Sequence, residues 1–189
     1  ILRNIGFVAR AAYAAGCAGL VFDPEFIYWG LEQGPFKYEH QAQAGVKSFA
    51  EIAAMARQRG TQFMGRIQQE FPNPVILNLF WLTHGFANAK AEYDPAARDA
   101  ILQGNLYGLL PAFMSSMLEA AGPETVIIDG TEPAYYYNTA NKFFRNYYEV
   151  HHWNQILVPR VLREHYRDKA LCGYGIYADY LCDTLGITV

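Results

Sequence analysis

The chain has 189 residues, of which 52% are hydrophobic and 17% are charged, and its formal net charge is −3. This length suits one domain with a sizeable core, and the composition excludes a disordered chain. Lysine and arginine form no cluster that would bind nucleic acid, and no apolar run reaches the ~20 residues that cross a bilayer. We therefore expect a single globular domain over residues 1–189, with neither nucleic acid nor a membrane as partner.

The first part of the chain alternates helix-like and strand-like segments. Residues 3–15 have helical periodicity and stop before Gly16, which suits a helix C-cap. A short apolar strand is expected at residues 18–22, and a long loop follows it. The next helix begins after Ser48, which forms a capping-box pattern with Glu51. The sequence thus begins with helix, strand, loop and helix.

The middle of the chain repeats this alternation. Residues 73–81 are apolar and are introduced by two prolines, which predicts a second strand. Residues 104–122 have helical spacing, and Pro111 is expected near the start of that helix. Residues 125–130 predict a third strand. Each strand is therefore separated from the next by helical sequence.

The last part of the chain completes a fourth unit. Residues 140–168 are expected to be helical, with Pro159 kinking or dividing the segment. Residues 170–179 predict the fourth strand. All four strands are short and continuously apolar, which is typical of parallel strands with both faces covered.

The alternation predicts an α/β fold built from parallel βα repeats. No glycine-rich phosphate loop follows a strand, so we expect no nucleotide cofactor. Long loops follow the strands while the returns are short, which is the layout of a barrel whose site lies at the carboxyl ends of its strands. Four units supply roughly half of a TIM-type (β/α)8 barrel. We expect a partial, possibly truncated barrel that forms a homodimer to cover its open edges.

Three of the four strand exits carry carboxylates. Asp23 and Glu25 follow the first strand, Asp129 and Glu132 follow the third, and Asp179 ends the fourth. Residues i and i+2 of an extended segment point to one side, so the first two carboxylates would be neighbours and one would hold a proton near neutral pH. Glycoside hydrolysis uses one carboxyl group as acid and another as nucleophile or base. We predict Glu25 as the acid, Glu132 as nucleophile or base, and the two aspartates as their catalytic helpers.

Aromatic residues make up 15% of the chain and are frequent in the predicted loops. Such rings either cover the edge of a core or stack on the rings of a carbohydrate. The expected substrate-binding residues are Tyr28, Trp29, Trp81, His84, Tyr135, Tyr136 and Tyr177.

Two quoted stretches resemble a known group of enzymes. "GLVFDPE" with the aromatic loop after it, and "VIIDGTEPAYYY", resemble the barrel domains of glycoside hydrolases and of glycosidase-like bacterial proteins. The Asp-x-Glu strand end is also similar to the chitinase-type motif. That resemblance implies a carbohydrate substrate, Glu25 as the acid, and Asp23 as its helper toward an acetamido group.

Two other functions use the same residues. Asp23, Glu25, His84, Asp129 and Glu132 form an oxygen-rich set with one imidazole, which suits a divalent metal in a metal-dependent barrel enzyme. No tight ligand spacing supports that alternative, so we expect neither metal nor other cofactor. The third possibility is a non-catalytic carbohydrate-binding domain that keeps the aromatic rings.

The cysteines bear on localisation. Cys17, Cys172 and Cys182 are an odd number without metal-ligand spacing, which favours free thiols and a reducing, cytoplasmic compartment. The chain begins at Ile1 and not at methionine, so a secreted, processed product stays open.

Overall fold

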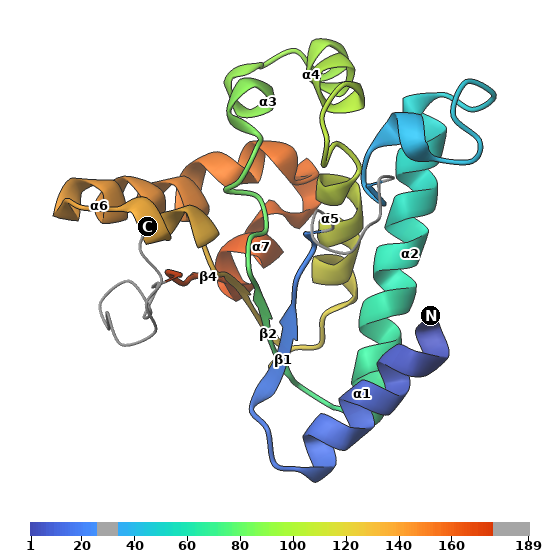
Figure 1. Cartoon of the computed structure of the whole chain (residues 1–189), viewed down its shortest axis with the longest axis vertical. Helices are drawn as coiled ribbons and strands as arrows, with labels where there is room; N and C mark the ends of the chain where they lie inside the picture. Colours follow the sequence, from blue (N-terminus) through green and yellow to red (C-terminus); the bar gives the residue numbers. More distant parts are fainter. Residues whose placement is uncertain (26–33, 176–189) are drawn as a thin grey trace, which may run out of the picture.

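The computed structural model describes residues 1–25 and 34–175 and contains a parallel four-stranded sheet packed against helices (Figure 1). The strands are β1 (Gly19–Phe22), β2 (Val75–Asn78), β3 (Val126–Asp129) and β4 (Ala170–Cys172). The α-helices are α1 (Leu2–Ala14), α2 (Phe49–Glu70), α3 (Ala87–Ala91), α4 (Pro95–Gln103), α5 (Leu110–Ala120), α6 (Ala140–Tyr148) and α7 (Arg163–Lys169). Short helical turns are η2 (Tyr38–His40), η3 (Glu132–Tyr136), the π-helix η4 (Glu149–Trp153), η5 (Asn154–Leu157) and η6 (Arg160–Leu162).

The strands lie in the order β1-β2-β3-β4, and every neighbouring pair is parallel. Each strand is therefore added beside the one that precedes it in the sequence, and all carboxyl ends meet at one edge. This confirms the α/β class and the parallel βα alternation. The fourth strand is shorter than predicted, and the expected residues 176–179 lie outside the described part of the chain.

Two predicted helix ends are confirmed in detail. Gly16 has a φ of 73°, and its N–H donates to the carbonyl of Tyr13 while the N–H of Cys17 donates to that of Ala12. This is a Schellman motif, which needs the left-handed conformation that glycine adopts without cost. At the start of α2, Ser48 and Glu51 form a reciprocal capping box. Local sequence signals thus set both helix ends.

Other helices differ from the prediction. The connection before α5 contains the helices α3 and α4, where the sequence predicts a loop. Helix α5 begins only at Leu110, with Pro111 in its first turn as predicted. The predicted helix over residues 140–168 is divided into α6, η4, η5, η6 and α7. Pro159 separates η5 from η6 because it lacks the N–H that a continuing helix needs. Within the described ranges, no helix has both the length and the apolar character that a membrane span requires.

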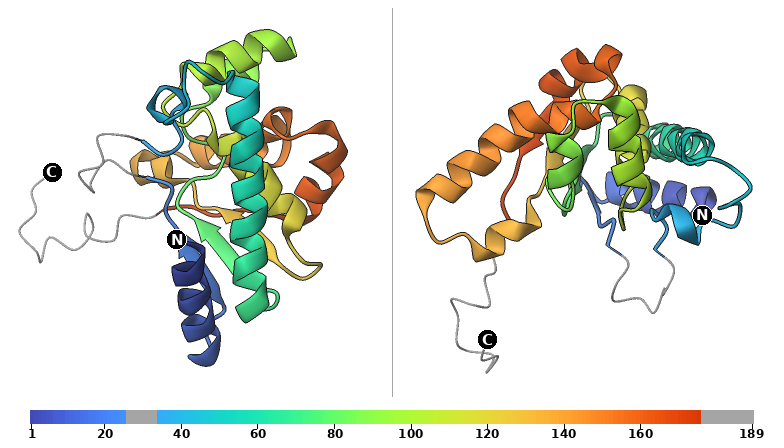
Figure 2. Two further views of the ribbon diagram at one scale, coloured as in Figure 1. Left: turned by 90° about the vertical axis from the view of Figure 1, so that its right-hand side faces the viewer. Right: turned by 90° about the horizontal axis from the view of Figure 1, so that it is seen from above.

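The core lies between one face of the sheet and the helices. Ile76, Ile127 and Ala170 occupy one row across β2, β3 and β4, and all are at most 1% exposed. Phe22 on β1 packs against Phe63 of α2, with ring centroids 5.1 Å apart. Helices α2 and α5 lie side by side over this face (Figure 2).

The opposite face of the sheet is apolar but less covered. The register places Val21, Leu77, Ile128 and Leu171 in one row across all four strands. Val21 is 66% exposed and Leu171 is 47% exposed, so both ends of this row meet solvent. The two faces of the sheet are therefore unequal, although the sequence predicts cover on both.

Candidate functional site

The first strand exit is a tight turn around a proline. Pro24 has no N–H and cannot extend the ladder of β1, so the strand stops at Phe22. The backbone N–H of Glu25 donates to the Asp23 carboxylate over 2.8 Å, which closes an Asx-type turn. Asp23 is exposed and Glu25 is half-buried. The local sequence therefore projects Glu25 from the carboxyl edge of the sheet.

The third strand exit passes very close to the second. Gly130 donates its N–H to the carbonyl of Asn78 over 2.8 Å. A Cβ atom at Gly130 would lie 2.5 Å from that same carbonyl oxygen, so no larger residue fits without a backbone shift. Two residues further on, the N–H of Glu132 donates to the carbonyl of Leu79 over 3.1 Å. These two bonds fix the path that carries Glu132.

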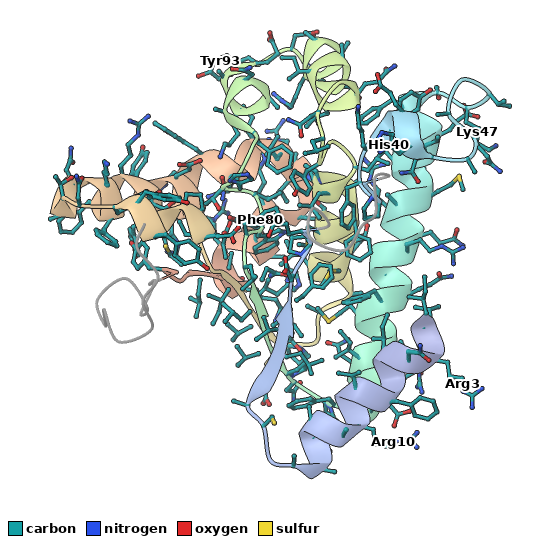
Figure 3. All side chains as sticks on the ribbon, in the orientation of Figure 1. Arg3, Arg10, His40, Lys47, Phe80 and Tyr93 are labelled. Atoms are coloured by element: carbon teal, nitrogen blue, oxygen red, sulfur yellow. The ribbon has the colours of Figure 1, made fainter. Side chains whose placement is uncertain are left out.

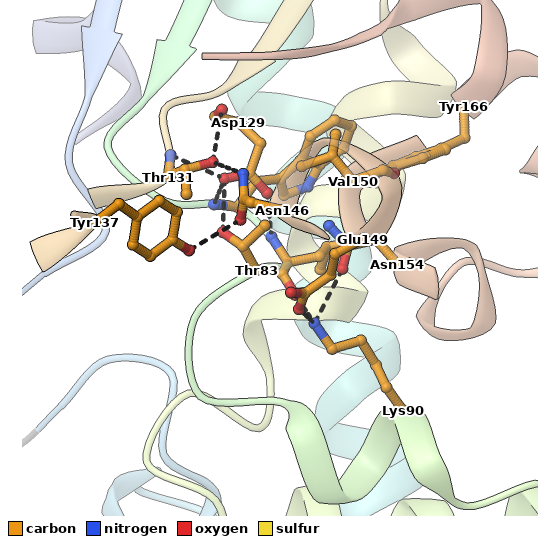
Figure 4. A network of polar contacts seen from close by, with 12 residues as sticks. Thr83, Lys90, Asp129, Thr131, Tyr137, Asn146, Glu149, Val150, Asn154 and Tyr166 are labelled. Atoms are coloured by element: carbon orange, nitrogen blue, oxygen red, sulfur yellow. Dashed lines mark hydrogen bonds and ion pairs between the residues drawn. The ribbon is translucent and has the colours of Figure 1, made fainter. Parts of the chain in front are cut away.

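A buried polar network holds this exit in place (Figure 4). Thr131 has a φ of 47° and a ψ of 61°, a left-handed conformation that is unfavourable for a β-branched residue. Its hydroxyl accepts a hydrogen bond from Asn146 Nδ2 over 2.9 Å, and both side chains are at most 2% exposed. The strained residue immediately precedes Glu132, so the network determines where that carboxyl group lies.

Asp129 is the centre of the network and has a different role from the one predicted. Its carboxylate is fully buried on the helix-covered face and accepts the N–H groups of Trp81 (3.1 Å) and Leu82 (3.0 Å), the hydroxyl of Thr83 (2.8 Å) and the N–H of Thr131 (3.3 Å). Burial raises the pKa of Asp129, and the four donors oppose that rise. This carboxylate ties the loop after β2 to the end of β3 and is a positioning residue with no access to substrate.

A second polar cluster anchors the same loop from the other side. Lys90 on α3 forms an ion pair with Glu149 on the π-helix η4 (Figure 4). Its ammonium group also donates to Asn154 Oδ1 and to the carbonyl of Leu82, each over 3.0 Å. The Lys90 side chain is only 6% exposed, so its charge is largely removed from water and is satisfied by these partners. The loop after β2 is therefore held at two points.

The carboxylates of the two strand exits influence each other. Burial raises the pKa of Glu132, and the negative charges of Glu25 and Asp23 raise it further. Because such an influence fades with distance, the three carboxylates share one region at the edge of the sheet. The structure thus brings together three of the four predicted catalytic residues. Among the described residues, no group of three or more His, Cys, Asp or Glu side chains is arranged to hold a metal ion.

Tyr107, which the sequence analysis did not select, belongs to the same region. Burial raises the pKa of its phenol to about 12, and the charges of Glu25, Asp23 and Glu132 add to the effect. Its ring packs on Phe80, with centroids 5.1 Å apart. Tyr107 precedes α5 in the chain, so a third connection supplies a hydroxyl group to the carboxylate cluster.

His84 lies beside this ring pair. Its ring centroid is 5.1 Å from that of Phe80 and 6.3 Å from that of Tyr107, and the residue is exposed. Phe80 is buried at the centre of the molecule, just past the end of β2 (Figure 3). His84 is thus placed near the predicted site, on its solvent side.

Of the remaining aromatic residues predicted to bind substrate, one is buried in the core and others lie at the surface. Trp81 is 0% exposed and packs on Tyr166 with centroids 5.1 Å apart, so it is a core residue and offers no face to a sugar. Tyr135 is half-buried and Tyr136 is 80% exposed, and both lie in η3 directly after Glu132. The predicted substrate-binding residues outside the described part of the chain are Tyr28, Trp29 and Tyr177.

Comparison of the chain with protein-family models, with curated proteins and with solved structures found no match. The chemistry of the site therefore has to be inferred from its own geometry. A half-buried carboxyl group with a raised pKa lies near two further carboxylates and a phenol, at the carboxyl ends of parallel strands. Such a cluster is suited to transferring a proton to or from a bound substrate.

Proposed function

We propose that the chain is a glycosidase-type hydrolase whose reaction takes place at the carboxyl edge of the sheet. One observation carries the proposal: Glu132 has a raised pKa because it is partly buried and lies near Glu25 and Asp23. Cleavage of a glycosidic bond needs one protonated carboxyl group beside one ionised carboxylate. The exposed rings of Tyr136 and His84 lie on elements next to this cluster and would contact the sugar.

The electrostatics favour exchanging the roles that the sequence suggests. The surroundings of Glu132 raise its pKa and so favour its protonated form, and it is therefore assigned as the general acid that protonates the leaving oxygen. Glu25 is assigned as the second carboxyl group, which acts on the anomeric carbon or on its water molecule. Asp23 accepts the Glu25 backbone N–H over 2.8 Å and so orients the turn that carries this partner. Tyr107 supplies a hydroxyl group that stays protonated at neutral pH.

Aryl glycosides with good and poor leaving groups test these roles. In Glu132→Gln, turnover of substrates with poor leaving groups should fall by roughly 10²–10⁴-fold, the usual contribution of a general acid. Activated aryl glycosides, which need little protonation, should lose much less. In Glu25→Gln, both substrate types should lose activity. The control is Glu119→Gln, because Glu119 is exposed on α5 and makes none of these contacts.

The outcomes separate the competing functions. The reverse pattern, with leaving-group dependence in Glu25→Gln, would restore the assignment of Glu25 as the acid. Activity that EDTA abolishes and a divalent metal restores would instead support the metal-dependent enzyme. Sugar binding without cleavage of any glycoside by the unmodified chain would leave only the carbohydrate-binding function.

We further propose that the sheet is roughly half of a TIM-type barrel and that a second copy of the chain completes it. The sequential strand order and the helix layer on one face support this layout. The apolar row of the other face, which ends in the exposed Val21 and Leu171, would line the closed barrel. Light scattering at micromolar concentration should give a dimer that Val21→Glu dissociates. Val161→Glu is the matched control, because Val161 is 87% exposed on η6. A monodisperse monomer of the unmodified chain would contradict the proposal.

A further inference from the structure

A cavity lies on the helical side of the molecule, and none of the clustered carboxylates borders it. Its volume is about 340 Å³, and it is bordered by the first half of α2, by α4, by the start of α5 and by the segment from η5 to α7 (Figure 1). Asp23, Glu25 and Glu132 are not among the residues that border it. This volume lies within the range of small-molecule sites. The cavity therefore requires an explanation separate from the proposed hydrolase site.

Arginine dominates the charge of the cavity wall. Arg57, Arg98, Arg160 and Arg163 border the cavity, together with a single acidic residue, Asp99. None of these arginines forms an ion pair with a carboxylate in residues 1–25 and 34–175. Four arginines from the four elements α2, α4, η6 and α7 surround one cavity and concentrate positive charge in a chain whose net charge is −3. Such a concentration attracts an anion.

The arginines keep hydrogen-bond donors available. Arg163 uses Nε to donate to the carbonyl of Val158 over 3.3 Å, and neither of its Nη groups has a partner among the described residues. The side chains of Arg57 and Arg160 make no hydrogen bond within that part of the chain. Arg98 is committed to backbone carbonyls on both sides of the cavity, including a 2.6 Å bond from Nη2. Three guanidinium groups can therefore bind a ligand while the fourth holds the wall together.

Apolar side chains and one buried serine form the rest of the cavity wall. Leu102 and Leu157 are buried where they border it. Ser115, on α5, is 2% exposed and also borders the cavity, and its Oγ atom has no hydrogen-bond partner among the described residues. A buried hydroxyl without a partner is unfavourable, because it has lost its bonds to water. The Oγ atom itself has almost no accessible surface, so it lies behind the cavity wall and takes no part in binding a ligand.

We propose that this cavity binds a small phosphomonoester with a compact apolar body. The phosphate dianion pairs with the guanidinium groups of Arg57, Arg160 and Arg163, whose planar donors match phosphate oxygens. The carbon body lies against the apolar part of the wall. A dianion suits three free arginines better than a monocarboxylate does, because it neutralises more of their charge. The site is independent of the carboxylate cluster.

Calorimetric titration of the full chain tests this site, with phenyl phosphate, inorganic phosphate and benzoate as probes. Phenyl phosphate should bind saturably at one site and more tightly than either other probe. Arg57→Gln and Arg163→Gln should each weaken its binding by about tenfold or more, as expected for a lost charged hydrogen bond. Arg59→Gln is the matched control: Arg59 lies on the same helix, is exposed, and bonds to Gln62 over 2.8 Å.

Further measurements separate this site from the proposed hydrolase site. Glu132→Gln should leave the binding unchanged. Absence of saturable binding, inorganic phosphate binding as tightly as phenyl phosphate, or tighter binding of benzoate would each overturn the proposal. So would an equal loss in Arg59→Gln, which would indicate general attraction to a positive surface.

Discussion

Replacing Asp129 by asparagine should destabilise the chain measurably although the side chain keeps its shape. The carboxylate accepts four hydrogen bonds in a site that is 0% exposed. Oδ1 takes three of them and Oδ2 takes the N–H of Leu82 over 3.0 Å. An asparagine can present its oxygen to the first three donors, but its NH₂ group then faces the Leu82 N–H. One buried donor left unsatisfied costs about 1–3 kcal/mol of unfolding free energy.

The alanine variant separates this cause from simple loss of volume. Asp129→Ala removes both oxygens and leaves at least two buried donors unsatisfied, so the loss should reach about 3 kcal/mol or more. Urea unfolding followed by circular dichroism at pH 7 measures both variants against Asp168→Asn, which changes an exposed aspartate of α7 in the same way. Two results would refute the reasoning: an Asp129→Asn variant as stable as the control, or an alanine variant no worse than the asparagine variant.

Three other predictions use the same unfolding assay. Lys169→Met should lower the free energy of unfolding by about 2–3 kcal/mol, because the buried ammonium group donates to three backbone carbonyls at 2.5, 2.8 and 3.1 Å. An unchanged free energy of unfolding would contradict this prediction. Arg10 and Arg66 lower the pKa of Glu70 to about 2 from an ordinary 4.5. The folded chain should therefore lose stability as the pH falls from 4.5 toward 2, and Glu70→Gln should remove that part of the acid sensitivity. The pKa of Glu132 is raised above 4.5, so its contribution is present below pH 4.5 and is lost as pH rises through the folded pKa. Glu132→Gln should flatten that slope, and an unchanged slope would show that another group causes it.

The sequence is sufficient to predict the four strands and the order in which they follow one another along the chain. The four apolar segments become four parallel strands, and the carboxylates after the first and third meet at one edge, because parallel strands end on the same side. Gly16 and the Ser48–Glu51 pair also act as predicted, since a helix cap depends on residues only a few positions apart. These features can be predicted because a helix cap depends on neighbouring residues and because strands and helices alternate regularly along the chain.

Side-chain direction could not be predicted in the same way. Asp129 and Glu132 are three residues apart and look alike in sequence, yet one is fully buried and the other reaches the site. The left-handed turn at Thr131 makes this difference, and its cost is balanced by Asn146, which comes from a helix 15 residues away. Tyr107 was missed for a similar reason, because its place depends on how the loop before α5 folds onto Phe80.

The two carboxylate-bearing exits differ in how firmly they are held. Glu132 follows a strained residue that is fixed by a buried network and by a backbone bond to Leu79. Glu25 is oriented by one hydrogen bond within its own turn, between its N–H and Asp23. A general acid must lie in a set position beside the leaving oxygen and in surroundings that raise its pKa, and both needs are met by rigid, partly buried protein. The network is therefore consistent with the acid role that we propose for Glu132, and the turn that carries Glu25 is fixed by fewer contacts within the described residues.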